Sequence, residues 1–193
     1  MLELLAPAGN LDAVIAAVQN GADAVYMGFG DGFNARRSAD NFTQESFAKA
    51  VRYCHIRGCK VYVTLNTLVG DREMDAAAAL AQQASDAGAD AILVQDLGLA
   101  RVLRAALPDI PLHASTQMSI HNLAGVEAAA EMGITRAVLA RELSLEQIRF
   151  ISQHASIETE VFVHGALCFC YSGQCYMSCL LYTSPSPRDM RRS

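Results

Sequence analysis

A cysteine-rich segment near the C-terminal end carries the side chains best suited to chemistry. Residues 160–178 read EVFVHGALCFCYSGQCYMS, with thiols at Cys168, Cys170 and Cys175 and an imidazole at His164. In a protein of the cytoplasm, clustered thiols more often hold a metal or cluster, or act in catalysis, than form a disulfide. Zinc is one alternative, although the spacing is not that of a CxxC site. Spacing alone leaves a metal or cluster site and simple packing equally open.

A repeating unit of helix, glycine and short apolar strand must position this segment. Glycines just past a helical stretch mark four helix-to-strand junctions, at Gly21, Gly58, Gly88 and Gly133. Apolar runs predict seven strands, over residues 3–5, 24–27, 61–65, 91–94, 112–115, 137–140 and 160–163, with six helices between them. This alternation is typical of a parallel sheet, either closed as a barrel or open and doubly wound.

Polar residues at the expected helix starts predict where some helices begin. Residues 144–147, Ser-Leu-Glu-Gln, have the form of a capping box, and Asn10, Thr43 and Asp71 are candidate N-caps. Two further cysteines, Cys54 and Cys59, lie outside the cysteine-rich segment. We interpret them as small apolar residues of the core.

Polar residues also follow nearly every predicted strand, and they favour the barrel. In a barrel all strand ends meet on one face, where (β/α)8 enzymes keep their sites, whereas an open sheet uses one switch point. We therefore predict an α/β fold with an incomplete (β/α)8, TIM-barrel-like parallel sheet. The candidate substrate-binding residues are Arg36, Asn66, Asp96, Gln117, Arg141 and Glu142.

Two of these candidates are arginines, and two have a competing structural interpretation. Arg36 and Arg141 suit a ligand with carboxylates, because a guanidinium binds a carboxylate through two parallel hydrogen bonds. A structural hydrogen bond or ion pair is the alternative for each candidate, above all for Asp96 and Glu142.

Composition and charge limit the class of protein. The chain has 193 residues, 52% of them apolar and 18% charged, which excludes disorder and predicts one sizeable core. Its 15 basic and 20 acidic residues give a net charge of −5, which argues against a broad phosphate-binding face. The sequence contains no apolar stretch long enough for a membrane span and no basic signal-peptide opening. We predict a cytoplasmic protein that does not enter the membrane.

The last fifteen residues differ from the rest of the chain. They show no helical or strand periodicity, and residues 179–189 match the translation of a common transposase sequencing adapter. We therefore expect one domain over residues 1–178 and a non-native tail over residues 179–193, with a longer parent protein.

Several motifs resemble the peptidase U32 family, also called collagenase-like proteases. They are LELLAPAGN at 2–10, NGADAVYMG at 20–28, NAR at 34–36 and the cysteine-rich segment. The last of these matches the family signature at every defined position: Glu160, Phe162, Gly165, Ala166, Leu167, Cys168, Gly173, Cys175, Met177 and Ser178. The resemblance covers essentially residues 1–178.

The resemblance implies a cofactor and a reaction. The family name asserts proteolysis, whereas the well-understood members are oxygen-independent hydroxylases of tRNA, ribosomal RNA or a quinone precursor, several with prephenate as the hydroxyl source. Those members hold a [4Fe-4S] cluster on four cysteines. Cys168 and Cys175 correspond to the first two, and the other two would lie beyond Ser178. Cys170 is outside the signature and receives no ligand role.

Three functional hypotheses follow. The first is a cluster-dependent hydroxylase of RNA or a related small-molecule substrate. The second is a protease in which Cys168 is the nucleophile and His164 its base. The third is a non-catalytic binding subunit that works with a partner subunit of the same family. The sequence does not choose among RNA, quinone precursor and peptide, and the acidic charge gives RNA no support.

Overall fold

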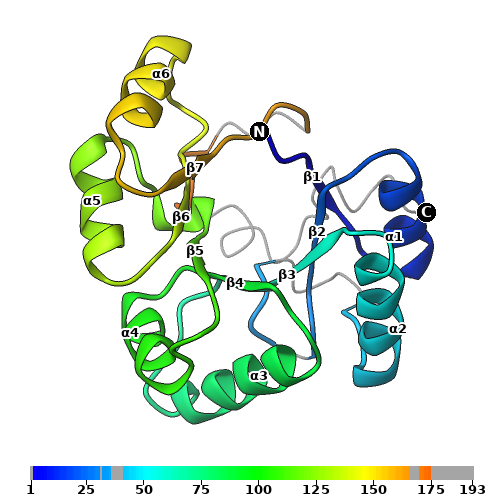
Figure 1. The fold of residues 1–193 in the computed structure, drawn as a ribbon. Helices are drawn as coiled ribbons and strands as arrows, with labels where there is room; N and C mark the ends of the chain where they lie inside the picture. The colour runs from blue at the N-terminus through cyan, green and yellow to red at the C-terminus, as the bar shows by residue number, and fades with distance from the viewer. Residues whose placement is uncertain (1, 31, 36–40, 166–169, 175–193) are drawn as a thin grey trace, which may run out of the picture.

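A single curled sheet of parallel strands forms the centre of the molecule (Figure 1). The computed structural model describes residues 2–30, 32–35, 41–165 and 170–174. Seven strands pair in chain order within these residues: β1 (Leu5–Pro7), β2 (Ala24–Met27), β3 (Lys60–Leu65), β4 (Ala91–Val94), β5 (Leu112–Ala114), β6 (Arg136–Val138) and β7 (Glu158–Glu160). The barrel-like prediction is confirmed. The doubly wound alternative is wrong, because such a sheet reverses its strand order at a switch point and this sheet does not.

Helices cover the outside of the curled sheet (Figure 1). The described residues contain six α-helices, as predicted: α1 (Leu11–Gln19), α2 (Gln44–His55), α3 (Met74–Asp86), α4 (Leu97–Ala106), α5 (Leu123–Glu131) and α6 (Leu145–His154). A short 3-10 helix, η1 (Thr116–Met118), follows β5. The four junction glycines have φ between 72° and 98°, which confirms the predicted left-handed caps. None of the helices described is both long and apolar enough to cross a membrane.

The first and last strands are shifted from their predicted positions. β1 begins at Leu5 rather than residue 3, because its partner β2 begins at Ala24 and the two residues pair directly. β7 ends at Glu160, which pairs with Val138, the last residue of β6. Residues 161–163 therefore form no ladder and are exposed. The predicted strand over 160–163 is wrong for that reason.

The helix caps agree with the sequence in all cases but one. Asn10 and Thr43 cap α1 and α2, and Ser144 forms the predicted capping box with Gln147. Asp71 is not a cap. The residue before α3 is Glu73, whose carboxylate instead accepts a hydrogen bond from the Gly70 amide in the preceding turn.

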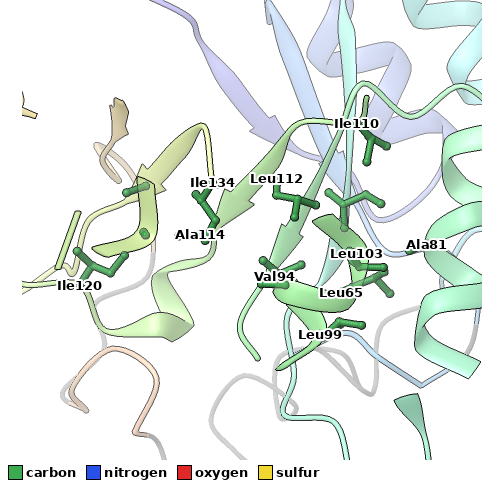
Figure 2. Packing of buried hydrophobic residues seen from close by; sticks show 14 of the residues in the cluster. Leu65, Ala81, Val94, Leu99, Leu103, Ile110, Leu112, Ala114, Ile120 and Ile134 are labelled. Carbon is green, nitrogen blue, oxygen red and sulfur yellow. The ribbon is translucent and has the colours of Figure 1, made fainter. Parts of the chain in front are cut away.

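Apolar side chains between the sheet and the helices form the largest part of the core. Figure 2 shows Leu65, Val94 and Leu112 of the strands against Leu99 and Leu103 of α4, and all five are at most 1% exposed. Strands buried on both faces read as continuous apolar runs. This packing holds the strand ends in fixed positions.

Cys54 and Cys59 belong to a second buried cluster between α1, α2 and the sheet. Both are buried, which confirms the predicted packing role. Burial raises the pKa of the Cys54 thiol to about 12, so this thiol stays protonated and unreactive.

Candidate functional site

The structure places the described candidate residues at one end of the sheet. Asn66 directly follows β3, and Asp96 follows β4 after one residue. Gln117 lies in η1, while Arg141 and Glu142 come shortly after β6. Because all strands are parallel, these residues share the C-terminal face of the barrel-like sheet. Their role in substrate binding stays a prediction.

Other predicted site residues lie outside the described part of the chain or are isolated within it. Arg36, Cys168, Cys175 and residues 179–193 are not among the described residues. His164 follows β7 and is exposed. It makes no hydrogen bond or ion pair with any residue that the structure describes. The proposed pairing of His164 with Cys168 therefore stays a prediction.

Asn66 links two neighbouring loops. Its side-chain oxygen accepts a hydrogen bond from the Ala35 amide at 3.1 Å. Its side-chain amide donates to Ser115 Oγ, also at 3.1 Å. Asn66 thus ties the loop after β2 to the end of β5, and both polar ends of its side chain have protein partners.

Asp96 is the N-cap of α4. Its Oδ1 accepts from the Leu99 amide at 2.8 Å, and its Oδ2 accepts from the Val69 amide at 3.4 Å. Capping explains why an acid stands there, since the first amides of a helix have no partner within it. The structure therefore shows the capping role, which the sequence had left as an alternative.

A network around Ser172 attaches the cysteine-rich segment to the end of β6. Ser172 is 1% exposed, and its amide and hydroxyl donate to Glu142 Oε1 at 2.8 and 3.2 Å. The hydroxyl also accepts from the amide and Nε of Arg141 at 3.3 and 3.4 Å. We call the five residues Ser119, His121, Arg141, Glu142 and Ser172 the Ser172 network.

The remaining members complete the network from the β5 side. Ser119 Oγ donates to the carbonyl of Ser172. His121 lies between the two loops, with Nδ1 2.5 Å from the Ser119 carbonyl and Nε2 3.3 Å from Glu142 Oε2. Arg141 Nη2 donates to the Cys170 carbonyl at 3.4 Å. The backbone of residues 170–172 is therefore bonded to loops from two strands.

Hydrogen bonds within the Ser172 network favour the ionised form of the Glu142 carboxyl. Burial alone would raise the pKa of this carboxyl. Hydrogen bonds from its own amide and from Ser172, together with nearby His121, outweigh burial and lower the pKa. The charged carboxylate is thus the form that accepts both hydrogen bonds from Ser172.

Gly173 is required by close contact between two loops. Its φ is +76°, in the region that favours glycine. A Cβ added to it would overlap the carbonyl oxygen of Gln117 and crowd Ser119 Oγ. The glycine of the family signature is thereby explained, because only glycine lets residues 170–174 lie against η1.

A second polar group, unforeseen from the sequence, lies at the opposite end of the strands. Arg136 begins β6 and donates to Glu3 at 2.5 Å and to Glu158 at 2.6 and 2.8 Å. Glu3 also accepts from Lys60 at 2.9 Å and from Tyr62 at 2.8 Å. We call these five residues the Arg136 cluster. Charges at the first residues of strands were the available signal, but their meeting depends on the curl of the sheet.

One buried and one half-buried side chain adjoin the Arg136 cluster. His113 packs edge-on against the Tyr62 ring, with the ring centroids 4.9 Å apart. Burial, helped by the positive charge of Arg136, lowers the pKa of His113 to about 3, so the ring is neutral. Glu160, the first residue of the family signature, has Oε2 3.6 Å from Arg136, and its burial raises its pKa. Its position indicates a structural role.

Sequence reasoning missed three members of the Ser172 network. Ser119, His121 and Ser172 were not among the predicted site residues. The polar run after β5, STQMSIH at 115–121, and the serine beside the signature glycine were signals available in the sequence.

Sequence comparisons identify relatives with two kinds of name. The sequence pattern of Peptidase family U32 matches residues 9–190. The chain is 45% identical over 177 residues to the 23S rRNA 5-hydroxycytidine C2501 synthase of Escherichia coli, covering 92% of this chain and 26% of the relative. It is 42% identical to tRNA hydroxylation protein P1 of Bacillus subtilis (91% and 42%) and 34% identical to a collagenase of Porphyromonas gingivalis (96% and 47%). The chain thus spans less than half the length of each of these relatives.

Solved structures agree on the fold. The U32 peptidase Mk0906 superimposes with a TM-score of 0.70 at 18% identity, covering 88% of this chain and 71% of that one. An Oleispira antarctica phosphodiesterase superimposes with a TM-score of 0.60 at 12% identity, covering 86% of each chain. At these identities the likeness concerns the fold alone. The matching sequence pattern and the curated relatives carry the assignment, and the chain belongs to the peptidase U32 family of enzymes.

Proposed function

We propose that this chain is part of an iron-sulfur-dependent, oxygen-independent hydroxylase of RNA. The observation that carries the proposal is the similarity to relatives named for hydroxylation of ribosomal RNA and tRNA, at 45% and 42% identity. The fold supports it, because the Ser172 network attaches the cysteine-rich segment to the face where barrel enzymes bind substrate. An RNA substrate also agrees with the predicted cytoplasmic location.

This chain would supply two of the four thiolate ligands of a [4Fe-4S] cluster. Cys168 and Cys175 would supply two thiolates, and a cluster held by thiolates provides one-electron redox chemistry when bound. Ser172 and Gly173 lie between these cysteines in the chain; the Ser172 amide donates to Glu142, and Gly173 packs against the Gln117 carbonyl. The two remaining ligands belong to the part of the parent protein that the resemblance places beyond Ser178.

Substrate binding is proposed for the polar strand ends that remain accessible. Gln117 lies next to the Ser172 network, and Arg141 is a member of it. Arg141 would present the unused part of its guanidinium to a carboxylate, as in prephenate. Arg36 is proposed for the same ligand. Asn66, Asp96 and Glu142 would act mainly by holding the surrounding loops, given the hydrogen bonds they make.

The test is anaerobic expression of the full-length parent gene. We expect brown protein with iron and sulfide, and RNA that gains one oxygen atom per modified nucleotide by mass spectrometry. Cys168→Ser should remove both the iron and the modification, whereas Cys54→Ser, at a buried core thiol, should retain both. Iron-free anaerobic protein would contradict the proposal.

A collagenase-like peptidase is the second candidate, favoured by the 34% identical relative named collagenase. Here Cys168 would attack the peptide with His164 as base, but His164 has no orienting partner among the described residues. Gelatin cleavage that is lost on Cys168→Ser and insensitive to iron removal would establish this function. A non-catalytic subunit would show neither activity, and a partner of the same family would co-purify with it.

A further inference from the structure

Tyr171 is an exposed aromatic ring on a fixed backbone. The residue is 65% exposed, whereas its neighbour Ser172 is 1% exposed. On one side the Cys170 carbonyl accepts from Arg141, and on the other Ser172 is bonded through its amide, hydroxyl and carbonyl. The Tyr171 carbonyl accepts from the Gln174 amide at 3.1 Å and closes a turn. The ring is thus presented to solvent with little backbone freedom to lose on binding.

A second ring lies beside it. The centroids of Tyr171 and His121 are 6.4 Å apart, with the planes tilted by 49°. His121 is itself held by the Ser119 carbonyl and by Glu142. The two planar groups therefore lie together at the C-terminal face of the sheet, within the segment that carries the signature cysteines.

The chemistry of this surface fits an unpaired base better than a phosphate backbone. The chain has a net charge of −5, and the two charged residues that bond to Cys170 and His121, namely Arg141 and Glu142, have opposite signs. Such a surface attracts phosphates weakly. Stacking on an aromatic ring needs no positive charge, and single-stranded RNA is commonly recognised this way.

We propose that Tyr171 is the stacking surface for an unpaired nucleobase of the RNA substrate, with His121 beside it. This inference rests on the proposed RNA function. It assigns Tyr171 to substrate binding and leaves the redox chemistry to other groups.

The test measures RNA binding by the full-length protein with variants of Tyr171. The probe is a single-stranded 12-nucleotide RNA containing 2-aminopurine, whose fluorescence falls when the base stacks. Tyr171→Phe keeps a ring and should bind within about twofold of wild type. Tyr171→Leu and Tyr171→Ala should bind about tenfold more weakly or worse, since stacking contributes about 1–3 kcal/mol per base and 1.4 kcal/mol is tenfold. KM for RNA should rise while kcat and iron content stay unchanged.

A matched control exists on α6. Phe150 is also an exposed aromatic residue beside a histidine, with its ring 4.5 Å from that of His154. Phe150→Ala should bind RNA like wild type. Amide exchange at Ser172 should be unchanged in Tyr171→Leu, which shows that the segment stays attached.

Each outcome separates the inference from the proposed function. If the wild type hydroxylates RNA and both Tyr171→Leu and Tyr171→Ala bind RNA normally, the inference alone is overturned. Failure of the wild type to bind or modify RNA overturns both. Loss of gelatin binding, in place of RNA binding, in Tyr171→Leu would assign the ring to a peptide and overturn the inference.

Discussion

The Arg136 cluster and the Ser172 network lie at opposite ends of the strands and connect different parts of the molecule. The Arg136 cluster joins the two edges of the curled sheet, since Arg136 on β6 bonds to Glu3, just before β1, and to Glu158 on β7. The Ser172 network joins a loop to the ends of β5 and β6. Breaking the first should weaken the whole domain, whereas breaking the second should release only the loop. Charged groups thus stabilise the fold at one end and position the cysteine-rich segment at the other.

Removal of Arg136 should have the largest effect, and it tests whether the Arg136 cluster stabilises the whole domain. Its side chain is 10% exposed and faces three carboxylates. Arg136→Met should lower the free energy of unfolding in urea by about 3 kcal/mol, because Glu3 would keep only Lys60 and Tyr62 as partners and the half-buried Glu160 would lose its neighbouring positive charge. Lys49→Met, in an exposed helical pair with Glu45, should change the free energy of unfolding very little. Equal effects would show that the Arg136 cluster is no more important than a surface pair.

Acidification should weaken the same cluster. Burial would raise the pKa of Glu3, but hydrogen bonds from Arg136, Lys60 and Tyr62 lower it from 4.5 to about 2. A depressed folded-state pKa gives stability that is present above pH 4.5 and lost as the pH falls toward 2. Urea unfolding across this range should show a loss of about 2 kcal/mol, typical of charged hydrogen bonds. Glu3→Gln should flatten this loss, and an unchanged pH dependence in Glu3→Gln would contradict the assignment.

Gly173→Ala tests how the cysteine-rich segment is attached at the C-terminal end of the strands. The added Cβ would overlap the Gln117 carbonyl, so residues 170–174 should detach from η1. Amide exchange at Ser172 should report a local stability lower by about 1–3 kcal/mol, with little change in global unfolding. Gly58→Ala is the control, because Gly58 has a similar φ of 72° but nothing within 4 Å of the added Cβ. Global unfolding of Gly173→Ala would make the segment part of the core.

Glu142 variants separate hydrogen bonding from charge. Glu142→Ala leaves the buried Ser172 amide without its acceptor, and exchange at Ser172 should reveal a loss of about 1–2 kcal/mol. Glu142→Gln keeps an acceptor oxygen and should retain most of the protection. Normal exchange in Glu142→Ala would show that the other bonds of the Ser172 network suffice.

Asp96 gives the smallest expected effect. Asp96→Ala removes the cap of α4 and should cost about 1 kcal/mol in urea unfolding, whereas Asp96→Asn should be nearly neutral because asparagine caps equally well. Weaker substrate binding by the stable Asp96→Asn variant would support the predicted binding role beside the capping role.

Local features of this protein could be read from the sequence. The junction glycines, the capping box at Ser144 and the alternation of apolar runs predict the helices, the strands and the barrel-like order. These signals act between residues a few positions apart, so they need no knowledge of distant partners. The polar strand ends followed from the same pattern, because parallel strands share one direction.

Only the tertiary structure decided which distant charges meet. Arg136 and Glu3 are 133 residues apart and approach because the sheet curls, while Ser172 reaches Glu142 across 30 residues. The tertiary structure also showed that Asp96 caps a helix and that Arg141 and Glu142 bond to Ser172. For these three residues the sequence had left substrate binding and structural bonding open. Side-chain partners depend on positions in space rather than on spacing along the chain. The physical reason is that strand register and curl, set by packing of the whole domain, fix these distances.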